Sequence, residues 1–317
     1  MKTSFGMRFV ISSFVMNRLK VLSVTGLSLM GALLWAQTAT ILALRGDVQV
    51  EQGNAWVKAT VGMKLQENQK IKIGPQAYAA LILPGNKARE LKEPGTYSIN
   101  QLLTQTTKAD NNPYAARYTG YVLNQAIASG AGRPSGKTLG AVTRSTMAPS
   151  PLTPAQSAFF AEKVLLQWDR VPGSEGYRVE ILDETGQVIH TEEVSADRHR
   201  VELNLTSKVK PNTCYYWSVS TRRYPTIKSN RTCFKVLPAD KAQALKNEEQ
   251  ELLRSLDTQT ALGQALLGAF YEQNGLYGYA LNAYQQAAAL EPNTEGYAEL
   301  RDGLSQRVVK SLTPVKE

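Results

Sequence analysis

The pattern of hydrophobic residues changes at Pro238, and this change most constrains what the chain can fold into. Before it, apolar residues occur in short alternating runs separated by glycine and proline, and a Gly/Pro/Ser-rich stretch divides this part in two. After it, the sequence is rich in Ala, Leu, Glu and Gln, with apolar residues at helical spacing. The sequence therefore predicts a multi-domain chain, in which two all-β domains are followed by an all-α tail.

Residues 40–100 form the first predicted β-domain. Its strand-like runs are separated by turn dipeptides such as Gly46-Asp47 and Pro84-Gly85. The runs are residues 42–44, 48–50, 56–57, 70–73, 79–83 and 96–99. Short strands at this spacing, with glycine and proline between them, indicate a sandwich or a barrel-like domain.

Many positions of this segment resemble the FecR-like periplasmic domain. The matching residues are Gly46, Val48, Val50, Trp56, Val61, Gly62, Met63, Leu65, Ile71, Ile73, Gly74, Ala80, Ile82, Pro84, Gly85, Gly95, Thr96 and Tyr97. The chain departs from the family at Asn68-Gln69, where the family prefers Gly-Asp, and at Lys72, where Thr is common. The resemblance implies ligand or partner sensing at the cell envelope, without catalytic residues. Since no later segment looks like a membrane span, we expect the sensing half of the family role and no direct anti-sigma activity.

Residues 101–161 are predicted to be a helix and a linker. Aromatic and apolar residues recur at helical intervals over residues 113–129, which predicts one helix there. Residues 130–154 are rich in Gly, Ser, Thr and Pro, and this composition indicates a linker, with one short strand expected around 139–143.

The linker contains a motif that has the loose spacing of a phosphate-binding loop, residues 131–138. Such a loop holds phosphate because a buried strand leads into it and a helix leaves it, so that backbone N–H groups converge. Here a predicted helix precedes the motif, Pro134 lies inside it, and no later apolar strand ends in an Asp for magnesium. We therefore expect no nucleotide cofactor.

Residues 162–237 form the second predicted β-domain. Its six predicted strands are residues 164–168, 177–181, 188–190, 200–203, 215–219 and 234–236. Several positions resemble the early strands of a fibronectin type III or immunoglobulin-like sandwich: Gln167, Trp168, Pro172, Tyr177, Val179 and Ile181. The resemblance implies that the Trp and Tyr side chains of this segment fill the core between two sheets.

The two cysteines of the chain, Cys214 and Cys233, flank two of these strands. Cysteine pairs normally close in the oxidising compartments outside the cytoplasm. Neighbouring antiparallel strands also bring two Cα atoms to disulfide distance. We therefore expect a structural disulfide between them.

The strongest motif lies in the C-terminal tail, residues 238–317, where residues 261–294 resemble a tetratricopeptide repeat. Seven of the eight signature positions match, namely Leu267, Gly268, Tyr271, Ala280, Tyr284, Ala287 and Pro292. Gln264 replaces the leading Trp. The resemblance implies two antiparallel helices, in which the small residues lie where the helices touch and the large ones fill the gaps.

One repeat cannot bury its own apolar face, so we expect the segments 240–255 and 295–311 to cap it. Repeat surfaces of this family bind peptides or partner proteins. Tyr277 and Tyr279, near the turn between the two helices, are the candidates for partner contact. Ordinary packing within the tail is the alternative.

Residues 1–36 have the features of a signal peptide. Four basic residues and no acidic one accompany an apolar run over residues 21–35, and small residues follow at the expected cleavage site. The run is shorter than the roughly 20 apolar residues of a membrane-spanning helix. We expect export to the periplasm or cell surface, with no membrane span after cleavage, and keep a retained anchor as the alternative.

Composition excludes several classes of site. With 2 cysteines and 2 histidines, the chain lacks the ligands of a structural zinc module, and we expect neither a metal nor a cofactor. The net charge is +9. Residues 37–237 hold 25 basic and 16 acidic residues, whereas residues 238–317 hold 7 and 11. This asymmetry favours an anionic envelope surface, or pairing between the two parts, over nucleic acid.

Together these modules predict a non-catalytic envelope protein that acts in ligand sensing, protein–protein recognition or scaffolding. One alternative is a carbohydrate-binding module that uses Trp217 or other aromatic residues of the second β-domain. The other is an enzyme that acts on cell-wall polysaccharide. Its candidate carboxylates, the adjacent pairs Asp183/Glu184 and Glu192/Glu193, could not flank one glycosidic bond, because neighbouring residues of a strand point to opposite faces.

Overall fold

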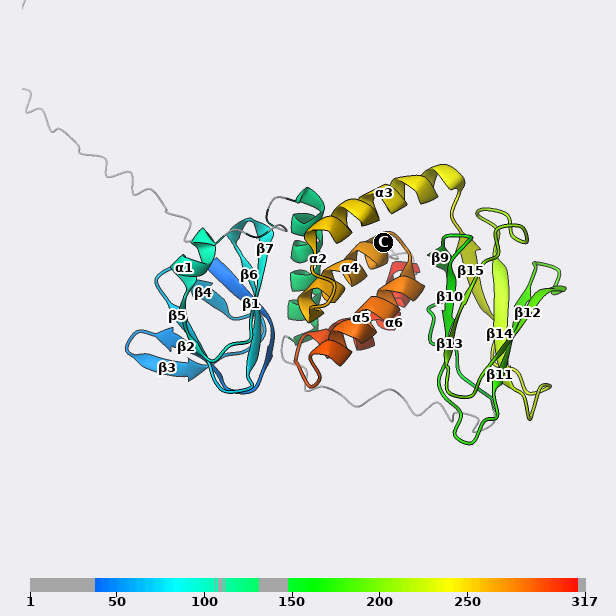
Figure 1. Ribbon diagram of the computed structural model, residues 1–317, viewed down its shortest axis with the longest axis horizontal. Helices are drawn as coiled ribbons and strands as arrows, with labels where there is room; N and C mark the ends of the chain where they lie inside the picture. Colours follow the sequence, from blue (N-terminus) through cyan, green and yellow to red (C-terminus); the bar gives the residue numbers. More distant parts are fainter. Residues whose placement is uncertain (1–37, 106, 108–109, 111, 131–147, 313–317) are drawn as a thin grey trace, which may run out of the picture. The chain divides into compact units, whose positions relative to one another are not determined.

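The computed structural model describes residues 38–312, apart from residues 106, 108–109, 111 and 131–147 (Figure 1). The predicted signal peptide, the 131–138 motif and the short strand expected around 139–143 lie outside the described residues. Among the helices of the described part, none is both long enough and apolar enough to cross a membrane.

The first β-domain contains eight strands and ends with a short helix, α1 (Ile99–Thr104). The strands are β1 (Thr38–Arg45), β2 (Val48–Gln52), β3 (Ala55–Lys58), β4 (Lys64–Gln66), β5 (Lys70–Ile73), β6 (Tyr78–Leu83), β7 (Lys87–Leu91) and β8 (Gly95–Ser98). A 3₁₀ turn, η1 (Pro84–Asn86), joins β6 to β7. Two four-stranded antiparallel sheets result, with the orders β4-β1-β6-β7 and β3-β2-β5-β8. The predicted all-β character of this segment is confirmed.

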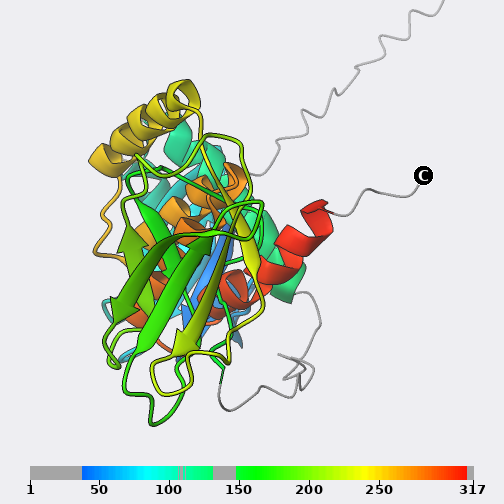
Figure 2. The ribbon, with the colours of Figure 1, turned by 90° about the vertical axis from the view of Figure 1, so that its right-hand side faces the viewer.

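The second β-domain also contains two sheets, whose strands are seen in Figures 1 and 2. The strands are β9 (Ser157–Phe159), β10 (Val164–Gln167), β11 (Tyr177–Leu182), β12 (Val188–Val194), β13 (Arg200–Leu203), β14 (Tyr215–Thr221) and β15 (Thr232–Val236). Their orders are β10-β13 and β12-β11-β14-β15-β9. The six predicted strands correspond to β10–β15, whereas β9, which pairs in parallel with β15, was not predicted.

The C-terminal helical region is confirmed as well. It consists of α3 (Ala239–Ser255), α4 (Ala261–Gln273), α5 (Tyr277–Leu290) and α6 (Tyr297–Leu312). Helix α4 begins after Thr260, whose hydroxyl accepts a hydrogen bond of 3.0 Å from the Gly263 N–H and so satisfies one free donor of the first turn. A turn that contains Gly275, at φ +74°, reverses the chain between α4 and α5.

The predicted helix over residues 113–129 is α2 (Pro113–Gly130). Unlike a linker, it packs against several other elements. It packs against β1, η1 and β7 of the first β-domain and also against α3, α4 and α6. The Tyr118 ring, fully buried, meets Phe270 of α4 edge-on, with 5.5 Å between the ring centroids. Helix α2 is therefore part of the same packed core as the C-terminal helices.

The two sheets of the first β-domain differ in how they are covered. On β5 the isoleucines are buried and the lysines exposed, so that one face of its sheet meets solvent. All six residues of β6 are buried. Ala79 and Leu81 lie in the core between the two sheets, whereas Tyr78 and Ala80 lie in the cluster that contains the helices. The sheet of β6 is thus covered on both faces.

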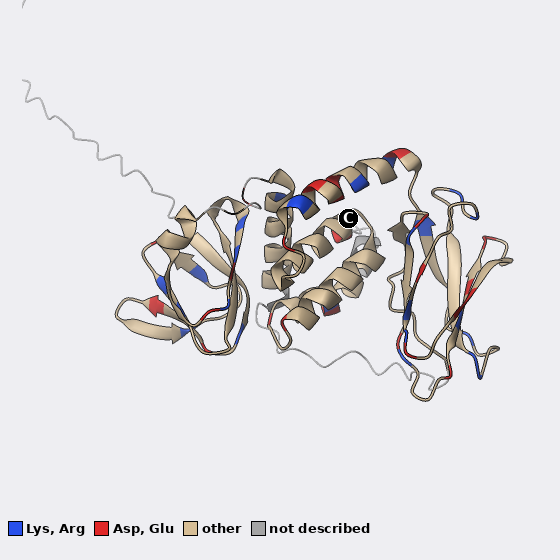
Figure 3. Cartoon of the chain, in the orientation of Figure 1, with Lys and Arg blue, Asp and Glu red and all other residues tan. Residues whose placement is uncertain are grey.

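Charged residues of both signs are interspersed on the strands of both β-domains and along α3 (Figure 3). Ion pairs such as Arg178 with Glu193 and Lys228 with Glu180 neutralise many of them locally.

Candidate functional site

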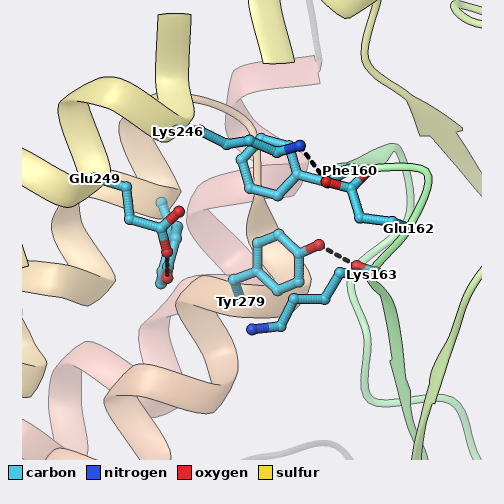
Figure 4. A pocket seen from close by; sticks show the side chains of 7 residues that line it. Phe160, Glu162, Lys163, Lys246, Glu249 and Tyr279 are labelled. Atoms are coloured by element: carbon cyan, nitrogen blue, oxygen red, sulfur yellow. Dashed lines mark hydrogen bonds and ion pairs between the residues drawn. The ribbon is translucent and has the colours of Figure 1, made fainter. Parts of the chain in front are cut away.

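A cavity of about 240 Å³ lies between the helical region and the turn that joins β9 to β10 (Figure 4). Its lining combines aromatic and charged side chains from α3, α4, α5 and that turn. The lining residues are Phe160, Glu162, Lys163, Lys246, Glu249, Tyr271 and Tyr279. Because aromatic rings and paired charges converge here, this cavity is the first place to look for binding or catalysis.

The aromatic wall of the cavity is built around Tyr279. Its ring stacks on Phe160 with 5.7 Å between the centroids and an interplanar angle of 24°. Tyr271 and Phe159 each lie 5.3 Å from it, measured between centroids. Such ring pairs contribute about 0.5–1.5 kcal/mol each beyond the area they bury. The cluster therefore fixes α5 against β9 and the turn that follows it.

The cations of the cavity lie over its rings. The Lys246 Nζ is 5.3 Å from the centroid of Phe160 and pairs with the Glu162 carboxylate. The Lys163 Nζ is 5.8 Å from the centroid of Tyr279. A cage of aromatic rings can bind a ligand cation. In this cage the chain's own ammonium groups already occupy that position.

The two tyrosine hydroxyls are used as hydrogen-bond donors. The Tyr279 hydroxyl donates to the Lys163 carbonyl, and the Tyr271 hydroxyl donates to the Glu249 carboxylate. Burial raises the pKa of both tyrosines well above the ordinary value, and the negative charge of Glu249 raises the pKa of Tyr271 further. Both hydroxyls therefore remain protonated at neutral pH.

The Glu162 carboxylate does not have the properties of a general acid. Burial acts to raise its pKa, but the hydrogen bond and charge of Lys246 outweigh this effect, and the pKa lies below its ordinary value. Glu162 is thus ionised and paired at neutral pH, whereas a catalytic acid needs a raised pKa. The contacts around the cavity hold α3 and α5 against the second β-domain, and we call this contact region a joint.

A second joint connects the helical region to the first β-domain. Leu44 of β1 exchanges two backbone hydrogen bonds, of 3.2 and 3.0 Å, with Glu295 in the loop between α5 and α6. The Tyr78 and Tyr297 hydroxyls are 2.6 Å apart, and Tyr78 donates to Glu90 at 2.5 Å. A Cβ atom on Gly296, at φ +100°, would lie 2.5 Å from the Leu42 carbonyl oxygen. Glycine therefore allows this loop to approach the sheet.

The residues of the predicted repeat signature lie on α4 and α5, apart from Pro292, which follows α5. A Cβ atom on Gly268 would lie 2.5 Å from the Tyr284 ring, so that the two helices are in contact at this point. Ala280 and Ala287 are completely buried, and Leu267 and Tyr271 are nearly so. These positions have the contacts that the resemblance implies, while the tetratricopeptide identity itself stays a prediction.

The two tyrosines expected to contact a partner have different surroundings. Tyr279 is only 5% exposed and packs inside the chain as described above, so its expected role as an exposed contact is wrong. The physical reason is that Gly278 leaves room for the Phe159 ring, which draws α5 onto β9. Tyr277 is partly buried against the same cluster of apolar residues.

The expected disulfide is confirmed. Cys214 and Cys233 are bonded, with 5.8 Å between their Cα atoms. Cys233 pairs in register with Tyr216 of β14, and Cys214 immediately precedes that strand. The bond therefore links β14 to β15 next to their first residue pair, Tyr215 and Phe234.

The tryptophans of the second β-domain are not available to a ligand. Trp168 and Trp217 are both 0% exposed, and the Trp168 ring lies 5.3 Å from that of Tyr177. Their predicted place in the core is confirmed. The alternative in which Trp217 stacks on a carbohydrate is therefore wrong, since burial in the sandwich core removes its ring from the surface.

The adjacent carboxylates considered for polysaccharide cleavage have structural partners. Asp183 accepts hydrogen bonds from the N–H groups of Thr185 and Gln187 in the turn before β12. Glu193 pairs with Arg178 and with Arg222, and these partners lower its pKa. Within the described residues, no group of three or more His, Cys, Asp or Glu side chains is placed to hold a metal ion.

The similarity of this chain to known proteins is confined to solved structures of low sequence identity. No protein-family model matches the chain, and no curated protein matches it significantly. Among solved structures, a Fn3-like protein from Clostridium thermocellum has 20% identity and a TM-score of 0.22, over 30% of this chain and 97% of that chain. The FN1-FN3 domains of chicken CNTN1 have 11% identity and a TM-score of 0.23, over 63% of this chain and 57% of that chain. Since these TM-scores are below 0.5, the two-sheet description of the second β-domain rests on its own strand pairing.

Proposed function

We propose that this chain is an exported, non-catalytic protein of the bacterial envelope that acts as a recognition scaffold. In this proposal the helical region holds the two β-domains as one body, and exposed faces of the β-domains recognise envelope components. The proposal includes a FecR-like first β-domain, a fibronectin type III-like second β-domain and a tetratricopeptide-like α4–α5 pair.

The observation that carries the proposal is that the helical region is joined to both β-domains through buried, specific contacts. On one side, Tyr297 meets Tyr78 of β6. On the other, Tyr279 donates a hydrogen bond to Lys163 at the start of the second β-domain. Surfaces used in this way are not free for peptide binding. Recognition is therefore assigned to the β-domains, and scaffolding to the helices.

Export and the lack of catalysis have separate support. The Cys214–Cys233 disulfide is typical of proteins that leave the reducing cytoplasm. The carboxylates of the cavity and of β12 are engaged in ion pairs and hydrogen bonds. In the cavity, Glu162 pairs with Lys246 and Glu249 accepts the Tyr271 hydroxyl proton, so neither carboxylate is free to act on a glycosidic bond.

Association with envelopes and hydrolysis are measured in one experiment. Purified protein is incubated with isolated bacterial envelopes, sedimented, and assayed for bound protein and for newly formed reducing ends. Cosedimentation without reducing ends supports the proposal. Release of reducing ends would show an enzyme, and failure to cosediment would remove the envelope role.

The scaffold part is tested with a variant that opens one joint. A Cβ atom on Gly278 would already lie 2.5 Å from the Phe159 ring, so Gly278→Val should separate α5 from β9. Gln286→Val is the matched control, because residue 286 is exposed on the same helix. The wild type and the control should unfold in one transition, and Gly278→Val in two. A single transition in Gly278→Val, with stability unchanged, would contradict the scaffold role.

A truncation at Pro238 is a poor test of this scaffold. It would uncover Tyr78 and Ile82 of the first β-domain and Phe159 of the second, which pack in one cluster with the helices. Loss of binding in such a fragment could then result from the newly exposed apolar surface, and it would not show that the helices themselves take part in binding. Single substitutions keep the chain intact.

A further inference from the structure

The outer face of the sheet β3-β2-β5-β8 carries two adjoining rows of partly or fully exposed side chains. Strand register places Gln49 opposite Lys58 on one side and opposite Lys72 on the other. Glu51 lies opposite Trp56 in the next row. The intervening residues, Val50, Ile71 and Ile73, point into the core. The full face comprises Gln49, Glu51, Trp56, Lys58, Lys70, Lys72, Thr96 and Ser98.

This face, which we call the Trp56 face, is positively charged. Of its three lysines, only Lys70 has a carboxylate partner, Glu51, at 3.5 Å. Lys58 and Lys72 form no ion pair with any residue that the structure describes. Two unneutralised ammonium groups on a flat sheet attract an anion, and the effect weakens with salt.

Trp56 gives the face an apolar element. It is 41% exposed, and the Lys72 Nζ lies 5.9 Å from its ring centroid. At an exposed site such a cation–π contact is weak, because water surrounds the ammonium group. A ligand that offers an anion to Lys72 and an apolar face to the indole can therefore displace the ammonium group from the ring with little loss of free energy.

We propose that the Trp56 face binds a carboxylate-bearing polysaccharide of the cell surface, an inference that deepens the envelope recognition proposed above. The C–H face of a sugar ring packs on the indole, which offers a large rigid apolar surface. Uronate carboxylates meet Lys58 and Lys72, and the sugar hydroxyls meet the polar side chains of Gln49 and Thr96.

The spacing of the face fits an extended chain of sugars. Adjacent strands lie about 4.8 Å apart, so Lys58 and Lys72, which flank β2, have backbones roughly 10 Å apart. This separation is close to the length of a disaccharide, so that alternate uronates of one chain reach both lysines. Nucleic acid fits less well. Glu51 lies opposite Trp56 and pairs with Lys70, so the face offers two lysines without a carboxylate partner among the described residues rather than the run of basic residues that a phosphate backbone requires.

Binding of polygalacturonate to the full protein tests the proposal, with uncharged dextran of similar length as the comparison. We expect Trp56→Ala and the double variant Lys58→Gln/Lys72→Gln each to weaken polygalacturonate binding by about tenfold or more, and dextran not to bind. Tyr224→Ala is the matched control. Tyr224 is 38% exposed and has Arg223 5.6 Å from its ring, but it lies in the second β-domain. This control should bind as the wild type does.

Several outcomes overturn the inference. They are absence of polygalacturonate binding, binding that Trp56→Ala leaves unchanged, and equally tight binding of polyglutamate or DNA. The envelope cosedimentation assay separates this inference from the proposed function. If the Trp56 and lysine variants cosediment as the wild type does, the Trp56 face is not the recognition site and the scaffold proposal stands. If the wild type fails to cosediment, the proposed function itself is wrong.

Discussion

Tyr78 and Tyr297 are separated by 219 residues in the sequence, yet their hydroxyl oxygens lie 2.6 Å apart in the core. Tyr78 donates its proton to Glu90, so Tyr297 must donate to the Tyr78 oxygen. The same Glu90 carboxylate accepts the Leu262 N–H at the start of α4, at 3.0 Å. One short hydrogen-bonded chain thus ties β6, β7, α4 and α6 together.

The two tyrosines should differ in the cost of losing their hydroxyls. In Tyr78→Phe, the buried Tyr297 hydroxyl loses its acceptor and Glu90 loses a donor, so we expect a loss of about 1–3 kcal/mol in the free energy of unfolding. In Tyr297→Phe, Tyr78 still bonds to Glu90, and we expect about 0.5–1.5 kcal/mol. Urea unfolding of both variants measures the difference.

Tyr97→Phe provides the control for this pair. The Tyr97 hydroxyl donates to the Glu93 carbonyl in an exposed turn, so its loss should change the free energy of unfolding by at most about 0.5 kcal/mol. Equal costs for Tyr78→Phe and Tyr297→Phe would show that the hydrogen-bonded chain runs differently.

Gly268→Ala tests the contact between α4 and α5. Alanine normally favours a helix over glycine by about 1 kcal/mol. Here the new Cβ atom would lie 2.5 Å from the Tyr284 ring, so the helices must move apart. Overpacking of this kind costs about 1–3 kcal/mol. We therefore expect a lower melting temperature, and an unchanged or higher one would contradict the close contact.

The sequence predicted the core of the first β-domain in part. On β5, the alternation of Lys70, Ile71, Lys72 and Ile73 predicts one buried face, which the structure confirms. On β6, the apolar run over residues 79–83 is uninterrupted, which is typical of a strand covered on both faces. The covering elements come from α2 and from helices far along the chain, and a local pattern carries no information about them.

The residues of the candidate site were also predicted only in part. The repeat signature includes Tyr271, and Tyr279 was expected to be an exposed partner contact; both line the cavity, but Tyr279 is buried. Their hydrogen-bond partners Glu249 and Lys163 have no motif around them, because their role depends on how α3 and α5 pack on the second β-domain. For the Trp56 face, the alternation of lysine and isoleucine on β5 predicts that Lys70 and Lys72 point to the same side of the sheet. The contact between Lys72 and Trp56 depends on how β5, β2 and β3 pair, and the sequence pattern does not give this register.

The Cys214–Cys233 bond should stabilise the folded chain. It closes a loop with a sequence separation of 19 residues, for which chain entropy gives about 3 kcal/mol. We expect Cys214→Ser/Cys233→Ser to lose about 2–4 kcal/mol in the free energy of unfolding. Alkylation in denaturant without reductant should label no thiol in the wild type. Two labelled thiols, or a double variant as stable as the wild type, would contradict a structural disulfide.

Stability should fall at alkaline pH because several tyrosines are buried. Desolvation raises the pKa of Tyr284 well above 10.0, and the charge of Glu272, which accepts its hydroxyl proton, raises it further. Burial likewise raises the pKa of Tyr78 and of Tyr297. In the unfolded chain these groups ionise near pH 10. A raised folded pKa therefore contributes stability that is complete below about pH 10 and is lost as the pH rises above it.

Each such tyrosine should add a slope of about 1.4 kcal/mol per pH unit to the fall in the free energy of unfolding above pH 10. Urea unfolding at several pH values, combined with tyrosinate absorbance of the folded protein, measures this slope. Tyr284→Phe removes one buried hydroxyl and should make the slope shallower by that amount, whereas Tyr224→Phe, at an exposed position, should not change it. Equal slopes in the wild type and Tyr284→Phe would mean that Tyr284 ionises in the folded chain near its ordinary pKa, which contradicts its burial between α4 and α5.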